Sequence, residues 1–283
     1  MNCMLCPVGC NADRKQISGR CGTKGLRIAK FGLHFYEEPC ISFEKGSGAI
    51  FFCGCALRCR FCQNFELSRN LRGREITPAE LADIFRALED MGAENVNLVN
   101  PSHLLPLIKE AFGLYRPRIP VVYNSHGYEK TDALESIAPF VDIWLPDLKF
   151  FSPKISARYT GREDYFPYAI KAVEFMAKKP LLFDERGKML SGTVVRHLIL
   201  PLCTDDSIAI VDRLAPIKDN IYLSLMRQYT PFGDIADLPE LQRKITAREY
   251  KKVLQHTLAL EFPHLFLQDK ESADTSYIPV WDD

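Results

Sequence analysis

Residues 55–62 read Cys-Ala-Leu-Arg-Cys-Arg-Phe-Cys and place three thiols within one short loop. A structural zinc site takes four donors in a tetrahedron, whereas a 4Fe–4S cluster held by three thiolates keeps one iron open for an outside ligand. The preceding run, Gly-Ala-Ile-Phe-Phe-Cys-Gly at 48–54, predicts a short apolar strand that ends in glycine. The pattern therefore predicts a 4Fe–4S cluster bound by Cys55, Cys59 and Cys62 on the loop after a first strand.

The other cysteines are also concentrated near the start of the chain. Nine of the ten cysteines in 283 residues come before residue 63. Ten is too few for a disulfide scaffold of this length, and the first six residues lack the charged region and apolar core of an export signal. We therefore expect a cytoplasmic protein whose thiols stay reduced and bind metal.

Four of the early cysteines form a second group, separated by gaps of two, three and ten residues. Four thiolates can close a metal site, and zinc and a second iron–sulfur cluster are both compatible with them. The chain is predicted to divide into a cysteine-rich metal-binding segment at 1–40 and a larger domain at 41–283. The cysteines of this second predicted site are Cys3, Cys6, Cys10 and Cys21.

The composition excludes several classes of protein. Hydrophobic residues make up 47% of the chain and charged residues 25%, with 36 basic and 36 acidic side chains. A formal net charge of zero argues against a protein that binds nucleic acid mainly through phosphate attraction. No apolar run approaches the roughly 20 residues that a bilayer span needs. We therefore expect a globular protein that binds neither nucleic acid nor a membrane.

The rest of the sequence alternates short apolar runs with helical patterns. Capping boxes at 77–80 and 246–249 predict two helices that begin near Thr77 and Thr246. Strands that are apolar on both faces and alternate with helices are typical of a parallel sheet covered by helices. We predict an α/β fold with six strands in a partial barrel, in which ligands lie at the carboxyl ends of the strands. After the first strand, the predicted strands lie at 95–99, 120–124, 141–146, 193–200 and 221–226.

The three-cysteine loop, with Phe61 directly before its last cysteine, resembles the signature of the radical S-adenosylmethionine (SAM) superfamily. Later segments resemble the branch of iron–sulfur proteins related to pyruvate formate-lyase activating enzyme. The resemblance implies a partial (β/α)6 radical SAM barrel, here with a small amino-terminal cysteine-rich segment, and SAM bound at the open iron of the cluster. The segments are NVNLVNPSH (95–103), VVYNSHGY (121–128), VDIWLPDLKF (141–150), VVRHLILP (194–201) and MRQYTP (226–231).

Two cysteines depart from this pattern, because the branch does not usually have cysteine at the positions of Cys40 and Cys53. These two cysteines are either extra metal ligands or simple substitutions without a metal role, and we favour substitution. A glycine-glycine-glutamate segment, which binds the SAM amino group in many members, is also absent after the second strand. Asn100 and Ser102 stand there instead, either as replacements for its hydrogen bonds or as an Asn-Pro turn with a serine helix cap.

Polar side chains follow most of the other predicted strands. Asp147 and Lys149 resemble the Asp-x-Lys of glycyl-radical activators, and strand alternation puts both on one face. Arg196 is a charge inside an apolar run, and its planar guanidinium suits either the SAM carboxylate or a structural salt bridge. The residues expected to contact SAM are Phe61, Asn100, Ser102, Asn124, Ser125, Asp147, Lys149, Arg196 and Gln228.

The function implied by the resemblance is reductive cleavage of SAM, which gives methionine and a 5′-deoxyadenosyl radical that abstracts hydrogen. The electron comes from a donor such as flavodoxin or ferredoxin. The leading substrate is a glycine of a partner enzyme, which becomes a glycyl radical. Modification of another peptide or of a small molecule, with an auxiliary amino-terminal cluster, is the alternative. A metal-binding partner protein that no longer cleaves SAM is the non-enzymatic alternative.

Overall fold

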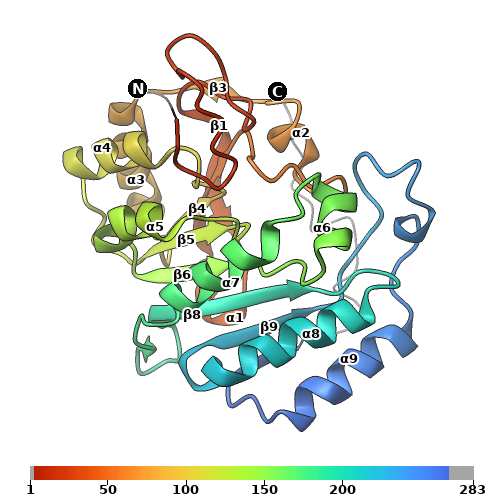
Figure 1. The fold of residues 1–283 in the computed structure, drawn as a ribbon. Coiled ribbons are helices and arrows are strands. Elements are labelled where there is room, and N and C mark those ends of the chain that lie inside the picture. Colours follow the sequence, from red (N-terminus) through yellow and green to blue (C-terminus); the bar gives the residue numbers. More distant parts are fainter. Residues whose placement is uncertain (1–2, 268–283) are drawn as a thin grey trace.

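The computed structural model describes residues 3–267, and its centre is a sheet whose parallel strands follow one another in chain order. Each of these strands is hydrogen-bonded in parallel to the next. This arrangement confirms the expected α/β partial barrel (Figure 1). The six strands are β2 (Ser47–Phe52), β4 (Val96–Val99), β5 (Val121–Ser125), β6 (Ile143–Pro146), β8 (Met189–Leu198) and β9 (Tyr222–Met226).

Further strands, which the sequence patterns did not predict, extend this sheet at both edges. At one edge β1 (Arg27–His34) pairs antiparallel with β2 and with the short β3 (Arg74–Glu75). At the other edge β10 (Leu265–Leu267) pairs parallel with β9. The short β7 (Leu182–Phe183) lies off this strand order and pairs antiparallel with the amino-terminal part of β8. Part of the segment before residue 40 is therefore bonded to the sheet, and the division at that residue stays a prediction.

Helices occupy most of the connections between the parallel strands. Both predicted capping boxes are present, and the Thr77 and Thr246 side chains each accept a hydrogen bond from the backbone N–H three residues later. Helices α8 and α9 lie side by side along β8 and β9 (Figure 1). The α-helices are α1 (Pro39–Ser42), α2 (Phe65–Ser68), α3 (Pro78–Asp90), α4 (Leu105–Leu114), α5 (Thr131–Ile137), α6 (Pro153–Thr160), α7 (Tyr165–Met176), α8 (Thr204–Leu214) and α9 (Ala247–Ala259), and the 3₁₀ helices are η1 (Ala138–Phe140), η2 (Ala215–Asn220) and η3 (Pro239–Leu241).

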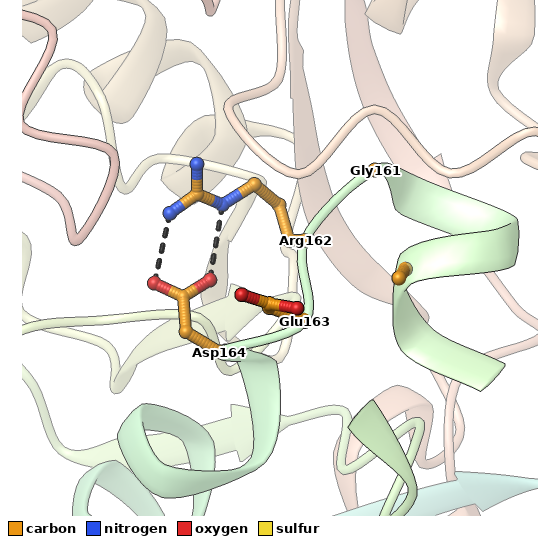
Figure 2. A pocket seen from close by; sticks show the side chains of 5 residues that line it. Gly161, Arg162, Glu163 and Asp164 are labelled. Atoms are coloured by element: carbon orange, nitrogen blue, oxygen red, sulfur yellow. Dashed lines mark hydrogen bonds and ion pairs between the residues drawn. The ribbon is translucent and has the colours of Figure 1, made fainter. Parts of the chain in front are cut away.

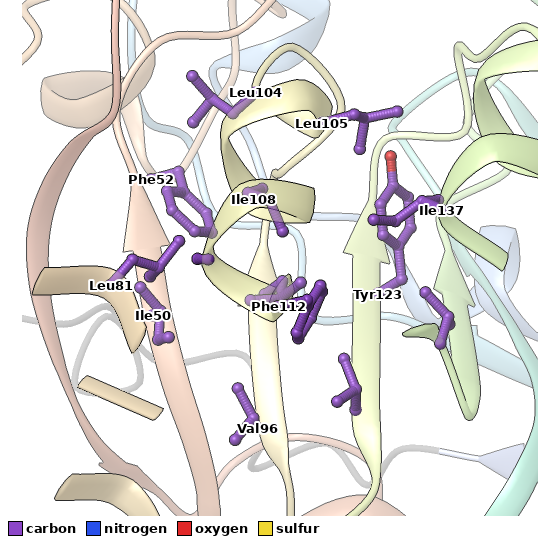
Figure 3. Close-up of a cluster of buried hydrophobic side chains, with 14 of the residues drawn as sticks. Ile50, Phe52, Leu81, Val96, Leu104, Leu105, Ile108, Phe112, Tyr123 and Ile137 are labelled. Atoms are coloured by element: carbon purple, nitrogen blue, oxygen red, sulfur yellow. The ribbon is translucent and has the colours of Figure 1, made fainter. Parts of the chain in front are cut away.

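The two faces of the sheet pack against different parts of the chain. Alternate residues such as Val96 and Tyr123 join the apolar faces of α3 and α4 in one large buried cluster (Figure 3). The intervening residues, such as Val122, point to the opposite, inner face. There the short helix α1 inserts Cys40 and Ile41 into a second buried cluster. The packing of Cys40 in this cluster supports its interpretation as a substitution.

No helix within residues 3–267 is both long enough and apolar enough to cross a membrane.

Candidate functional site

The three-cysteine loop follows β2 at the carboxyl edge of the sheet. Gly54 turns the chain with φ +85°, and a Cβ there would lie 2.5 Å from the Cys21 carbonyl oxygen, so this position requires glycine. The next amide, that of Cys55, donates to the same oxygen at 3.1 Å. Cys55 and Cys59 are buried and Cys62 is partly exposed. The loop is thus held against the amino-terminal segment at its first cysteine.

Burial affects the acidity of two of these thiols, those of Cys55 and Cys59. It raises the pKa of Cys55 to about 11 and raises that of Cys59 as well, although the charge of Lys149 lowers both. Thiols in this environment are protonated at neutral pH, so a metal must displace their protons to bind. Within residues 3–267 no three Cys, His, Asp or Glu side chains converge on one ion position. Thiolates that bind different irons of a 4Fe–4S cluster do not converge in that way.

Phe61 forms the apolar wall behind the loop. Its ring makes edge-to-face contacts with Phe150, Tyr159 and Tyr229, at centroid distances of 6.0, 5.9 and 6.1 Å. Tyr229 also donates a hydrogen bond to the Leu241 carbonyl oxygen at 2.7 Å, as expected of a packed tyrosine. These rings exclude water from one side of the loop.

A buried ionic cluster lies at the carboxyl ends of β6 and β8. Lys149 Nζ lies 2.6 Å from Asp147 Oδ2, and Arg196 Nε donates to Asp147 Oδ1 at 2.8 Å. Although burial acts to raise it, the pKa of Asp147 is lowered because Arg196 and Lys149 stabilise its charge. Asp147 and Lys149 also influence the Cys59 thiol electrostatically, so the cluster lies beside the cysteine loop. On the opposite face, His197 is bonded to the Leu148 carbonyl and to Ser207 and has a structural role.

Glu37, which the sequence did not single out, enters the same cluster from the segment before α1. Its carboxylate accepts hydrogen bonds from Asn97 Nδ2 at 3.2 Å, from Asn124 Nδ2 at 3.1 Å and from Arg196 at 3.0 Å. The Asn124 oxygen in turn accepts from Arg196 at 2.6 Å. Burial raises the pKa of the neighbouring Glu38 to about 7. Glu37 and Glu38 stand in a stretch that resembles the same branch, but no role was predicted for either, because they reach the site only through the path of the edge segment.

The two predicted serines bind a different carboxylate. Ser102 donates to Glu129, and Ser125 is also hydrogen-bonded to it. Burial raises the pKa of Glu129 to about 7, against the effect of these hydroxyl donors. Gln228 is half-buried, and its amide donates to Met226 Sδ at 3.8 Å. The structure therefore gathers four predicted residues in the ionic cluster, Asn124, Asp147, Lys149 and Arg196, and places the two serines and Gln228 in other contacts.

Buried polar atoms without partners at these strand ends fit a polar ligand. Asn100, with φ +63°, donates to the Gly54 carbonyl, while its own Oδ1 has no partner. Asn97 Oδ1 and His126 Nε2 are also unpartnered. The Tyr128 amide donates to His126 Nδ1, so the proton of this ring is on Nε2, and burial lowers its pKa to about 3. These groups could satisfy a ligand that carries both donors and acceptors, such as SAM.

The cysteines of the second predicted site lie in a segment that runs across the same edge of the sheet. Cys6 lies close enough to Cys3 and Cys10 for their charges to act on its pKa, which burial raises to about 11. Cys21 instead lies against the turn at Gly54. Since no three such donors converge within the described part of the chain, zinc or an iron–sulfur cluster at these four cysteines stays a prediction.

A surface pocket lies at the turn between α6 and α7, and no side chain of the ionic cluster lines it. Its lining includes Gly161, Arg162, Glu163 and Asp164, and Arg162 forms a two-point ion pair with Asp164 (Figure 2). Arg162 Nε also donates a hydrogen bond to the Tyr128 hydroxyl oxygen at 2.9 Å. None of the residues predicted to contact SAM lines this pocket.

Comparisons with known proteins bear on the site. Residues 49–184 match the family described as the radical SAM superfamily. The uncharacterised protein MJ0674 of Methanocaldococcus jannaschii is 30% identical over 268 residues, which cover 90% of this chain and 73% of that protein.

Two solved structures are similar at low identity. SuiB of Streptococcus suis bound to S-adenosylmethionine aligns with a TM-score of 0.47 and 17% identity, over 75% of this chain and 44% of SuiB. Methylornithine synthase PylB aligns with a TM-score of 0.47 and 11% identity, over 72% of this chain and 59% of that enzyme. The chain thus spans less than half of the length of SuiB.

Proposed function

Because this chain belongs to the radical SAM superfamily, we propose that it is an enzyme that holds a 4Fe–4S cluster on Cys55, Cys59 and Cys62 and cleaves SAM reductively. The observation that carries the proposal is the position of the loop. It places the buried Cys59 thiol within electrostatic reach of Asp147 and Lys149, which come from a strand end well apart in sequence. The bound cluster and SAM supply a 5′-deoxyadenosyl radical for hydrogen abstraction.

The side chains around the loop have defined tasks in this proposal. Arg196 uses three of its five N–H groups on Asp147, Glu37 and Asn124, and Lys149 uses one of three on Asp147. The remaining donors bind and orient the carboxylate of SAM.

The unpartnered oxygens of Asn97 and Asn100 accept from the amino group or the ribose hydroxyls of SAM. Phe61 and the rings packed on it keep water away from the reacting atoms.

We further propose that the hydrogen donor is a glycine in a partner enzyme and that the electron comes from flavodoxin or ferredoxin. The support is the resemblance of the quoted segments to the activating-enzyme branch. Deuterium labelling tests the substrate. A partner protein carrying deuterated glycine is expected to transfer deuterium into 5′-deoxyadenosine, and transfer only from another peptide or from a small molecule would contradict this assignment.

The binding of SAM to the cluster is tested by electron paramagnetic resonance of the reconstituted, reduced protein. Adding SAM is expected to change the cluster spectrum, since SAM fills the open iron position. A spectrum that SAM leaves unchanged, in protein with a full cluster, would favour a metal-binding protein that no longer uses SAM.

A further inference from the structure

Three half-buried arginines surround the cysteine loop without a carboxylate partner. Arg20 comes from the amino-terminal segment, Arg58 from the loop itself and Arg69 from the residue after α2. We call them the loop arginines. Within residues 3–267, none of the three has a carboxylate oxygen within 4.0 Å, whereas nearby Arg162 is paired with Asp164. Unpaired charges that are partly removed from water are costly, so their placement needs a compensating anion.

The bonds of the loop arginines fix them in place without neutralising them. Arg20 donates to the carbonyl oxygens of Ala56 at 3.0 Å and Thr160 at 2.7 Å. Arg69 donates to the carbonyl oxygen of Arg58 at 2.6 Å. The Nε atoms of Arg58 and Arg69 are buried and have no hydrogen-bond partner. The Arg20 and Arg69 guanidinium groups are thus anchored to the backbone of the loop, and part of the donor capacity of Arg58 and Arg69 is unused.

The same groups are close to one another and to the cluster-binding thiols. Burial lowers the pKa of Arg20, and the charges of Arg58 and Arg69 lower it further. Burial and the charge of Arg58 likewise lower the pKa of Arg69. In both cases negative charge on Cys55 acts in the opposite direction, and for Arg69 so does charge on Cys59 and on Asp234, which lies beyond ion-pair distance. Charge on the thiolates and their cluster is therefore the nearby source of compensation that Arg20 and Arg69 share.

We propose that the loop arginines compensate the negative charge of the reduced cluster and thereby raise its reduction potential. This inference rests on the proposed function. In the step concerned, the cluster takes one electron from a one-electron donor and gains one unit of negative charge, and no proton moves and no bond breaks. Nearby positive charge stabilises the reduced form more than the oxidised form, and the surroundings of an iron–sulfur cluster set its potential in this way.

Arg60 supplies a matched control on the same loop. It also adjoins Cys59, but it is paired with Asp237 and lies within 3.6 Å of Asp234. Its charge is therefore already neutralised, and its removal should leave the potential of the cluster almost unchanged. A neutral substitution at Arg60 thus separates the effect of uncompensated charge from that of altering the loop.

The experiment is a redox titration of the reconstituted cluster, followed by electron paramagnetic resonance, in Arg20→Gln, Arg69→Gln, Arg69→Lys and Arg60→Gln proteins. The midpoint potential is expected to fall in Arg20→Gln and Arg69→Gln. It should stay near the wild-type value in Arg60→Gln, and in Arg69→Lys, which keeps the charge but loses the guanidinium geometry. Arg20→Gln tests the proposal independently if Arg69→Gln fails to take up a cluster.

Equal potentials in all variants that still assemble a cluster and cleave SAM would overturn the charge role and leave the proposed function intact. A fall in Arg60→Gln as large as that in Arg69→Gln would also overturn it. Wild-type protein that takes up no 4Fe–4S cluster would overturn both the charge role and the proposed function.

Discussion

Arg196 joins three strands and the edge segment through its contacts with Asp147, Asn124 and Glu37. The sequence could predict that a charge in an apolar strand needs a partner, and it could place Asp147 at the neighbouring strand end. It could not predict Glu37, because that contact spans 159 positions in sequence and depends on how the edge segment enters the barrel. The sequence thus predicted which types of side chain lie at the strand ends, but it did not predict which residues they contact.

Replacing Arg196 with lysine should weaken SAM binding, because an ammonium group cannot donate hydrogen bonds to several separated acceptors as a planar guanidinium does. Hydrogen bonds to charged groups contribute about 1.5–3 kcal/mol, so the affinity should fall by about tenfold or more. Isothermal titration calorimetry with SAM measures this directly. Unchanged affinity in a folded variant would show that Arg196 is structural.

Loss of the proton from Glu129 should lower the free energy of unfolding as the pH rises. Its pKa is raised from 4.5 to about 7 in the fold, so the folded state binds the proton more tightly than the unfolded state. The stabilising effect of protonation is then complete below pH 4.5 and is lost as the pH rises to about 7. Relative to Glu129→Gln, the free energy of unfolding of the wild type should fall by roughly 3 kcal/mol across this range.

Chemical denaturation of both proteins at several pH values gives this difference. Comparing the two proteins cancels the opposite contribution of buried histidines such as His126, whose pKa is lowered to about 3. A difference in unfolding free energy that stays constant between pH 4.5 and 7 would contradict the assignment.

At the scale of elements, the sequence predicted the six parallel strands and the two capped helices because periodicity and capping are local signals. It missed β1, β3, β7 and β10, whose pairing depends on distant partners. It also missed that α1 packs into the inner face of the barrel, since Pro39–Ser42 is too short for a helical pattern. Elements that depend on residues close together in sequence could therefore be predicted, whereas strand pairing and packing between distant segments could not.

The turn from β2 into the cysteine loop gives a prediction at this scale. Gly54→Ala should destabilise the fold by at least about 1 kcal/mol and lower cluster occupancy, because φ is +85° and the Cβ would meet the Cys21 carbonyl oxygen. Gly113→Ala, in α4 with nothing within 4 Å of its Cβ, is the matched control and should be neutral or stabilising. Iron content and thermal unfolding report the result. Equal iron content in the two variants would show that this turn does not position the loop.

At the scale of the whole molecule, the amino-terminal segment joins parts of the barrel that are distant in sequence. Lys130 donates to the Met4 carbonyl oxygen at 2.9 Å, and Arg14 donates to the His103 carbonyl. Together with the hydrogen bond that Arg20 donates to the Ala56 carbonyl oxygen, these bonds hold the cysteine-rich segment over the ends of β2, β4 and β5. The sequence indicated the thiols of this segment but not its place beside the loop.

Replacing Cys6 and Cys10 together should remove one metal site and leave SAM cleavage measurable, because neither belongs to the three-cysteine loop. Cys40→Ala is the control, since Cys40 packs in the core beside Ile41. Elemental analysis for iron and zinc gives the outcome. The same metal content in the double variant and the wild type would show that these thiols hold no metal.

The central claim, reductive cleavage of SAM at the three-cysteine loop, is tested most directly by the yield of 5′-deoxyadenosine. The protein is reconstituted anaerobically, reduced with dithionite and given SAM, beside Cys59→Ala and, as control, Cys203→Ala, which removes a buried cysteine outside the three-cysteine loop. We expect 5′-deoxyadenosine from the wild type and Cys203→Ala and none from Cys59→Ala. No product from wild type with a full cluster, or equal product from Cys59→Ala, would contradict the claim.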